Sequence, residues 1–365
     1  MRRIILCSMF LVLIASCSEV GNHQTMFQLD EVKETNNSMS ELLTSVEYIP
    51  LETNDSCLLD ALSKQLYVRD YVYASSGAEI MKFDNRGKFV GKLSCLGNAP
   101  FEYVSIKDFD VVYREGNTEI WVAHPKGISR YNAETFDFMG LISLSCPVTH
   151  LKYVSDGTIV LQTASDYTFC LCDITGKIRN EFLEKDPANL SHGLLQFIPM
   201  PGGDVYCVLA GTDEAVRYNA ELDTLELVRY VSGVGSILTR DINREYMNRY
   251  GYLNQPSETA KNFCSVVTFR EKSGKTLLFL RTPKDERLLV KNADGWDSYL
   301  IHPESPIEND LLPGVSPRFL LTLASCDAEN CFIQSIPASM LDGMEINGKL
   351  IGSEDNPVIM KYLIK

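Results

Sequence analysis

The chain has 365 residues, of which 45% are hydrophobic and 10% aromatic, enough for two ordinary domains or for one large array of β-sheets. Its formal net charge is −14 at pH 7. A nucleic-acid partner is therefore not expected, because such a chain has no surplus of basic side chains to neutralise phosphates.

The first residues have the order of a targeting segment. Met1-Arg2-Arg3 is positively charged, and Ile4–Ile14 is apolar but too short to span a bilayer. Small residues then lead into Cys17, an order that resembles a bacterial lipobox. The resemblance implies that residues 1–16 are a lipoprotein signal peptide and that Cys17 carries the lipid that anchors the protein in the bilayer. The alternative is an ordinary secretory signal that contains a cysteine.

The segment after Cys17 is rich in Ser, Asn, Glu and Thr and has weak apolar periodicity. This composition predicts a lipidated cysteine followed by a mostly disordered tether over residues 17–44. The alternative is a short strand at Met26–Leu29 laid against the body, which comprises residues 45–365.

Short strands separated by polar turns follow one another along the body. Ser45–Leu51 alternates apolar and polar residues but has no neighbouring partner. The next strands form sets of four. These are expected at Leu58–Val68, Tyr71–Ser75, Ile80–Asp84 and Lys88–Leu93; at Ser105–Val112, Ile120–His124, Ile128–Asn132 and Phe138–Leu144; at Val148–Val154, Thr158–Thr163, Thr168–Asp173 and Lys177–Leu183; at Gly193–Pro199, Asp204–Ala210, Ala215–Asn219 and Leu225–Val231; and at Asn262–Arg270, Thr276–Arg281, Arg287–Asn292 and Trp296–Ile301.

A helical period interrupts the strands before the fifth set. Ser236–Tyr252 has apolar residues at four-residue spacing, and a proline follows in Gln255-Pro256-Ser257. The spacing predicts a helical insertion that ends near this proline.

The sets recur at a regular interval. The residues that close each third strand lie 48, 41, 46 and 73 residues apart, and the last gap holds the helix; they are Asp84, Asn132, Asp173, Asn219 and Asn292. About 40–50 residues per set of four strands is the repeat of propeller blades.

The two ends of the body complement each other. The sixth set has only three strands, at Arg318–Ser325, Asn330–Ile336 and Pro357–Ile364, and Ser45–Leu51 supplies the fourth. We therefore predict an all-β, six-bladed β-propeller closed by its N-terminal strand, which removes exposed sheet edges. Two β-sandwiches are the rival, but the irregular stretch Ser232–Thr259 divides the sets unequally, into four and two.

Three stretches resemble the six-bladed β-propeller lipoproteins of Gram-negative bacteria, a family of largely uncharacterised function. They are Tyr48-Ile-Pro-Leu-Glu-Thr53, Gly97-Asn-Ala-Pro-Phe-Glu-Tyr103 and Glu354-Asp-Asn-Pro-Val-Ile-Met-Lys-Tyr362. With the blade pattern, the resemblance covers the body and implies an outer-membrane lipoprotein facing the periplasm or the cell surface. Ala99 and Phe101 replace the glycines on either side of the family's proline, so a ligand approach through those glycines would be altered here.

The loop before the second blade holds the first candidate ligand-binding residues. In a propeller this loop leads to a strand that lines the central channel, so Pro100, Glu102 and Tyr103 could sit at a channel mouth. The alternative is an inter-blade turn in which Glu102 accepts backbone N–H groups and Tyr103 packs.

The five histidines show no H-x-H, HExxH or His-acid cluster, and no metal site is assigned. His150 and His192, at the starts of innermost strands, are the candidates for the channel. The others are His23, in the expected tether, and His124 and His302.

Nine cysteines remain after Cys7 and Cys17. Cys326 and Cys331 flank a four-residue hairpin loop, so they form a candidate disulfide. Cys170 and Cys172 point to the same face of one strand and suit packing between blades. Trp121 and Trp296 are expected to pack between blades as well.

No nucleophile elbow, P-loop or dinucleotide fingerprint is present, so no catalytic residue or cofactor is assigned. The sequence favours a lipid-anchored binding module for a glycan, a peptide or a partner protein, recognised by loops around the channel. Tyr246 and Tyr250 of the insertion are further candidate contacts, beside Tyr252. Two alternatives stay open: a channel-centred lyase or hydrolase using His150 or His192, with or without metal, and a structural subunit of an outer-membrane assembly.

Overall fold

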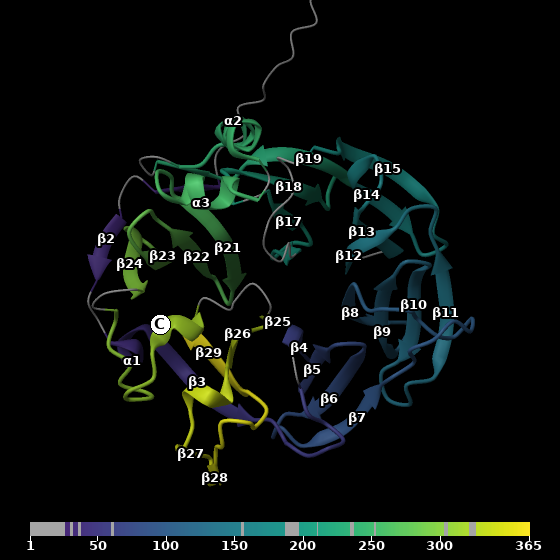
Figure 1. The fold of residues 1–365 in the computed structure, drawn as a ribbon, viewed down its shortest axis with the longest axis horizontal. Helices are drawn as coiled ribbons and strands as arrows, with labels where there is room; N and C mark the ends of the chain where they lie inside the picture. Colours follow the sequence, from purple (N-terminus) through teal and green to yellow (C-terminus); the bar gives the residue numbers. More distant parts are fainter. Residues whose placement is uncertain are drawn as a thin grey trace, which may run out of the picture.

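The computed structural model describes residues 26–29, 32–35, 38–59, 62–154, 157–186, 197–209, 211–233, 237–251, 253–302, 306–320 and 326–365. Six blades of antiparallel strands stand around a central axis, as the sequence predicts (Figure 1). In the first five blades the strands follow in chain order from the axis to the rim, because short turns join neighbours.

The first three blades are complete sets of four strands. Blade one is β4 (Leu62–Val68), β5 (Tyr71–Ser76), β6 (Glu79–Asp84) and β7 (Phe89–Leu93). Blade two is β8 (Asp108–Arg114), β9 (Asn117–His124), β10 (Gly127–Asn132) and β11 (Phe138–Ser143), and blade three is β12 (Val148–Tyr153), β13 (Thr158–Thr163), β14 (Tyr167–Asp173) and β15 (Ile178–Glu184).

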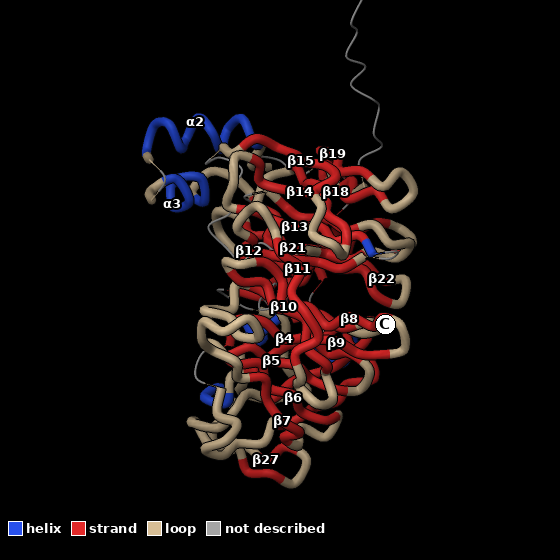
Figure 2. Tube along the Cα trace, turned by 90° about the vertical axis from the view of Figure 1, so that its right-hand side faces the viewer, coloured by secondary structure: helices blue, strands red, loops and turns tan. Residues whose placement is uncertain are grey.

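Blades four and five flank the helical insertion. Blade four is β16 (Ile198–Pro199), β17 (Val205–Val208), β18 (Glu214–Asn219) and β19 (Thr224–Arg229), and blade five is β21 (Ser265–Lys272), β22 (Lys275–Arg281), β23 (Glu286–Asn292) and β24 (Gly295–His302). Between them lie α2 (Arg240–Tyr250) and α3 (Gln255–Ala260), which project from one face of the ring (Figure 2). The predicted insertion is confirmed, with a second short helix containing Pro256.

The ring closes through strands from the two ends of the body. Blade six consists of β26 (Phe332–Ile336), β29 (Val358–Ile364) and β3 (Leu43–Pro50), in that order. β29 pairs with β3 in antiparallel register, with Ile359 opposite Ile49 and Lys361 opposite Glu47. The predicted closure is therefore confirmed. A small hairpin of β27 (Glu345–Ile346) and β28 (Lys349–Leu350) projects from this blade (Figure 1).

The prediction of an innermost strand for blade six at Arg318–Ser325 is wrong. Residues 317–320 form a 3₁₀ turn, and 321–325 lie outside the described residues. The next strand, β25 (Cys326–Ala328), pairs in parallel with β4 of blade one, Asp327 lying opposite Leu66. Main-chain hydrogen bonds thus join blade one to a segment that immediately precedes β26.

The described part of the expected tether is folded onto the body, so disorder over 17–44 does not hold there. β1 (Phe27–Gln28) pairs in parallel with β20 (Val231–Ser232), which is the alternative strand at Met26–Leu29. Phe27 is 2% exposed, and its ring meets Tyr230, Phe269 and Trp296 edge to face. The burial of Phe27 attaches the segment to the body by an apolar contact, although the segment as a whole is polar.

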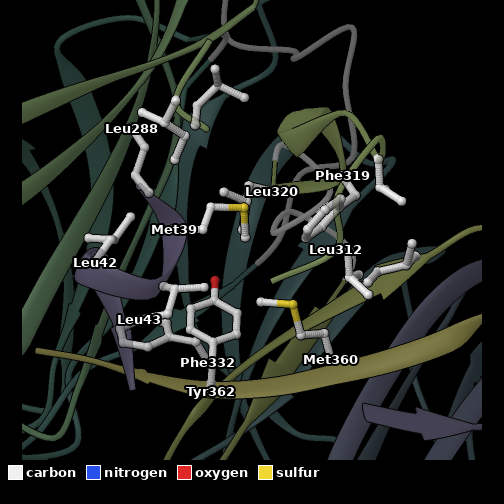
Figure 3. Close-up of a cluster of buried hydrophobic side chains, with 14 of the residues drawn as sticks. Met39, Leu42, Leu43, Leu288, Leu312, Phe319, Leu320, Phe332, Met360 and Tyr362 are labelled. Carbon is white, nitrogen blue, oxygen red and sulfur yellow. The ribbon is translucent and has the colours of Figure 1, made fainter. Parts of the chain in front are cut away.

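Two further elements continue this attachment. β2 (Val32–Thr35) pairs in parallel with β24 and becomes a fifth strand of blade five, on the rim in Figure 1. The short helix α1 (Met39–Leu42) turns Met39 and Leu42 into the core between blades five and six (Figure 3). The N-terminal segment therefore contacts blades four, five and six in succession.

In the part of the chain that the structure describes, the hydrophobic core is a ring of six clusters, each between neighbouring blades. Side chains that alternate along a strand enter the clusters on opposite faces of its sheet. In β22, Leu277 and Phe279 face blade six, whereas Leu278 and Leu280 face blade four. Trp121 and Trp296 lie in such clusters, and so do Cys170 and Cys172, as expected.

Candidate functional site

A cavity of about 460 Å³ lies at the axis, where segments of all the blades converge. Its apolar wall includes Leu66, Val68, Val111 and residues Pro199–Pro201 at the end of β16 and in the following turn. It is formed toward the C-terminal ends of β4, β16 and β21 and reaches solvent at exposed turn residues such as Ser273 and Asn330. The volume suits a small ligand or a single peptide side chain.

Charged side chains from several strands line the same cavity. They are Asp110 on β8, Lys152 on β12, Glu271 and Lys272 on β21, Asp327 on β25, and Glu329 beyond it. Both lysines are paired: Lys152 Nζ lies 2.9 Å from Asp110 Oδ1, and Lys272 Nζ lies 3.0 Å from Asp327 Oδ1. Among the described residues, the lining thus carries four carboxylates and two ammonium groups, so this part of it has an excess of negative charge.

The aspartates of β8 also satisfy the backbone of the neighbouring blade. Asp108 Oδ2 accepts a hydrogen bond from the N–H of Leu151 at 3.0 Å, and Asp110 Oδ2 accepts one from Tyr153 at 3.1 Å. Both donors belong to β12, an edge strand whose outer N–H groups would otherwise face the axis unpaired. Asp110 therefore has a structural bond on one oxygen and the Lys152 ion pair on the other.

A third ion pair lies deeper along the axis. Lys64 of β4 binds Asp108 Oδ1 at 2.9 Å and donates to the carbonyl of Phe109 at 2.7 Å. Lys64, Asp108 and the Asp110–Lys152 pair connect blades one, two and three around the axis. Because these contacts are largely buried, they hold the channel wall in one arrangement.

Neighbouring charges keep two cavity residues, Lys152 and Asp327, ionised at neutral pH. Burial acts to lower the pKa of Lys152, but the carboxylates of Asp110 and Asp327 outweigh it and raise that pKa. Burial acts to raise the pKa of Asp327, but Lys272, Arg270 and Lys152 outweigh it and lower that pKa. Such fixed charges suit the binding of a complementary ion better than proton transfer at pH 7.

The candidate histidines do not define this cavity. His150 lies on β12, half-buried, with its Nδ1 3.4 Å from Thr149 Oγ1, and burial lowers its pKa. It is near the Lys64–Asp108 pair but does not line the cavity. His192 and Cys17 lie outside the described residues. Within the ranges that the structure describes, no group of three or more His, Cys, Asp or Glu side chains could hold a metal ion.

The loop with Pro100, Glu102 and Tyr103 is an inter-blade turn, which is the alternative weighed above. Glu102 Oε2 accepts a hydrogen bond from the N–H of Ala99 at 2.8 Å, and a Cβ on Gly97 would lie 2.0 Å from that same oxygen. Tyr103 is fully buried, and its hydroxyl donates to the carbonyl of Ala78 at 2.8 Å. Pro100 is exposed in this turn. Because the loop precedes β8, it lies at the face opposite the cavity mouth.

The helical insertion lies at that opposite face as well, because it precedes β21. Arg240 and Arg244 of α2 pair with Glu214 at 3.0 Å and Asp186 at 2.7 Å and so attach the helix to the body. Tyr246 and Tyr250 are half-exposed and pack on one another, 5.4 Å between ring centroids. Neither tyrosine lines the cavity, and Tyr252 lies outside the described residues.

The candidate disulfide is not formed. Cys326 and Cys331 are both free thiols. The expected hairpin does not exist, because β25 and β26 belong to different sheets, and Cys326 Sγ lies 3.7 Å from Gln65 Oε1 on β4.

The charged residues at the axis were not predicted from the sequence. A signal for them existed: Asp108 and Asp110 alternate with apolar residues on a first strand, and Lys152 and Lys272 also lie on first strands. First strands of propeller blades face the axis, so charges there mark the channel wall.

The family described as Domain of unknown function (DUF4934) matches residues 25–362. None of the curated proteins matches the sequence. Among solved structures, a protein from Bacteroides fragilis NCTC 9343 that is named as an exported protein is similar, with a TM-score of 0.70 and 17% identity over 93% of this chain and 99% of that one. A member of the DUF4221 family from Bacteroides vulgatus ATCC 8482 has a TM-score of 0.52 and 13% identity over 90% and 99% of the two chains. These likenesses support the fold. Among the described residues, no helix is long and apolar enough to cross a membrane.

Proposed function

The chain belongs to the DUF4934 family, and we propose that it is an exported, lipid-anchored binding protein whose axial cavity holds a small ligand with a cationic group on an apolar body. Export is supported by the signal-like segment Met1–Ser16 and by the name of the similar Bacteroides fragilis protein. Cys17 would carry the anchor.

The observation that carries the ligand class is the charge of the cavity. Both cavity lysines are already neutralised by Asp110 and Asp327, whereas Glu271 and Glu329 have no ion-pair partner within the described ranges. A ligand ammonium or guanidinium group would compensate these two carboxylates. The apolar wall, which includes Leu66 and Val111, suits an aliphatic stem. A peptide that presents a lysine or arginine side chain offers the same chemistry.

Catalysis is less well supported than binding. A lyase or hydrolase at this site would need a proton donor or acceptor that titrates near neutral pH. The pKa values of Lys152 and Asp327 are instead moved away from neutrality by their neighbours.

Calorimetry with matched six-carbon probes tests the proposal. We expect hexylamine to bind and hexanoate not to bind the full chain. Glu271→Gln should weaken hexylamine binding about tenfold, because it removes a charge-assisted contact. Ala328→Trp should fill the cavity and abolish binding. Glu115→Gln, on an exposed turn outside the cavity lining, is the matched control.

Two results would contradict different parts of the proposal. Equal binding of hexylamine and hexanoate, blocked by Ala328→Trp, would retain the cavity as the site and reject its charge preference. Hexylamine binding that persists in Ala328→Trp, or no binding of either probe, would reject the cavity.

A further inference from the structure

Two carboxylates of the axial cavity, Glu271 and Glu329, form no ion pair with any basic side chain in the described part of the chain. Glu271 lies near the end of β21 in blade five, and Glu329 follows β25, which pairs with blade one. A single ammonium group carries one positive charge and leaves one of these carboxylates uncompensated. The positions of the two carboxylates around the cavity therefore decide which ligand can neutralise both.

Glu271 stands on the side of the cavity that blade four forms. Successive side chains of a β-strand point to opposite faces, so Glu271 shares its face with Phe269, and Lys272 points the other way. The ring of Phe269 lies 5.6 Å from that of Tyr206 on β17 of blade four. Lys272 instead reaches β25, where its Nζ lies 3.0 Å from Asp327 Oδ1. The alternation along β21 thus separates the Glu271 carboxylate from the neighbouring ion pair.

Glu329 stands on the side of the cavity that blade one forms. β25 runs parallel to β4 and ends with Ala328 opposite Tyr67. Glu329 follows Ala328 as Val68 follows Tyr67, and both Glu329 and Val68 line the cavity. The side chain of Glu329 is exposed, whereas that of Glu271 is half-buried. The two carboxylates therefore lie on different sides of the cavity.

The apolar wall of the cavity covers the same two sides. Met200 and Pro201 belong to the turn between β16 and β17 of blade four, and Leu66 and Val68 belong to β4 of blade one. An alkyl chain that crosses the cavity therefore meets apolar surface on the side of each carboxylate. This arrangement fits a ligand with a cationic group at each end of an apolar chain.

We propose that the cavity selects ligands with two cationic groups joined by an alkyl chain, such as α,ω-diamines, over ligands with one cationic group. The inference rests on the proposed function, because it takes the cavity as the binding site. One ammonium group pairs with Glu271, whose half-buried carboxylate is less screened by water and salt, and the other pairs with Glu329. The second charge-assisted contact should tighten binding about tenfold.

Calorimetry of the full chain with 1,6-diaminohexane tests the inference, and hexylamine is the matched probe of equal chain length. We expect the diamine to bind about tenfold more tightly than hexylamine at low salt concentration. A third probe, 6-amino-1-hexanol, has the same chain with a neutral polar end and should bind as weakly as hexylamine. The three probes together assign the gain to the second positive charge and not to an additional polar atom.

Three variants assign the gain to a place in the structure. In Glu329→Gln the ratio of the two affinities, diamine over hexylamine, should fall from about ten to about one. Glu115→Gln, on an exposed turn outside the cavity lining, should keep the ratio at about ten. Ala328→Trp should abolish the binding of both probes, because it fills the cavity.

Three results would overturn the inference. Equal affinities of the wild type for the diamine and hexylamine, both blocked by Ala328→Trp, would reject the second cationic group and retain the proposed function. A diamine advantage that persists in Glu329→Gln would show that Glu329 does not bind the second group. Binding of neither probe would reject the cavity, and with it both the inference and the proposed function.

Discussion

Lys272 Nζ lies 3.0 Å from Asp327 Oδ1, and this ion pair joins the innermost strand of blade five to β25, the short strand that pairs with blade one. The side chains are 8% and 18% exposed. The pair therefore spans the position where blade six has no innermost strand of its own among the described residues.

Removing one partner of this pair should destabilise the protein strongly. Asp327→Asn leaves the Lys272 ammonium buried without a counterion, so we expect a loss of about 2–3 kcal/mol in the free energy of unfolding. Urea unfolding monitored by tryptophan fluorescence measures it. Glu258→Gln, which breaks the exposed pair with Lys261, should cost less than about 0.5 kcal/mol. Equal losses in the two variants would show that the axial pair has no special role.

The penalty of Asp327→Asn should depend on pH. The folded-state pKa of Asp327 lies below its ordinary value, so its carboxylate stabilises the fold above the unfolded pKa of about 3.9. That contribution is lost as the pH falls through the lower, folded-state pKa. The difference in Tm between wild type and variant should be constant from pH 7 to about pH 5 and shrink below pH 4. A constant difference down to pH 3 would contradict the assignment.

Gly87 tests the closure of the ring. Its φ is +81°, and an added Cβ would lie 2.1 Å from the carbonyl oxygen of Pro50, at the end of β3. Gly116 has a similar φ of +83° and open space around it. Gly116→Ala should cost about 1 kcal/mol from backbone strain alone, whereas Gly87→Ala should cost about 2–4 kcal/mol because it also separates the two segments. Similar losses in chemical denaturation would mean that Pro50 does not pack as described.

Tyr103 should matter for stability and not for binding. Tyr103→Phe removes the hydroxyl that donates to Ala78 and leaves that partly buried carbonyl without this donor, at a cost of about 1–2 kcal/mol. The affinity for hexylamine should be unchanged, because the residue is not part of the cavity lining. Calorimetry and thermal unfolding of the same variant separate the effects. A weakened affinity at unchanged stability would restore this loop as a ligand site.

We predict that the burial of Phe27 holds the N-terminal segment against blades four and five. Phe27→Ala removes a ring packed against Tyr230, Phe269 and Trp296, and we expect β1 to detach before the ring unfolds. Limited proteolysis should then cleave within residues 26–38 much faster than in wild type. Val32→Ala, at an exposed position of β2, is the milder control. Equal cleavage rates for wild type and Phe27→Ala would indicate that the segment is already detached.

The blades could be predicted because each hairpin is specified by its own residues. The closure could be predicted because a surplus strand near the N-terminus matches a missing strand near the C-terminus. Each hairpin has its own alternation and turn, and the unpaired strand Ser45–Leu51 matches a deficit at the other terminus. The pairing of β25 with β4 could not be predicted, because three residues cannot specify which neighbouring edge they will join. Phe27 is likewise a single apolar residue in a polar segment.

The candidate site was predicted less well than the fold. The axial cavity combines Asp110, Lys152 and Lys272 from three blades, and their mutual distances depend on how the blades pack. Histidines and a loop motif were predicted instead, because their residue types are common in binding and catalytic sites. The charged residues at the axis are recognised only after the first strand of each blade is placed there.

The N-terminal pairings of β1, β2 and β3 set an order of assembly. Their partners are β20, β24 and β29, each more than 200 residues further along the chain. During synthesis β1, β2 and β3 therefore precede their partners, and none of the three can pair until its partner strand has been made. Until β29 is available, β3 has no partner in blade six, and the sheet that closes the ring lacks its outer strand.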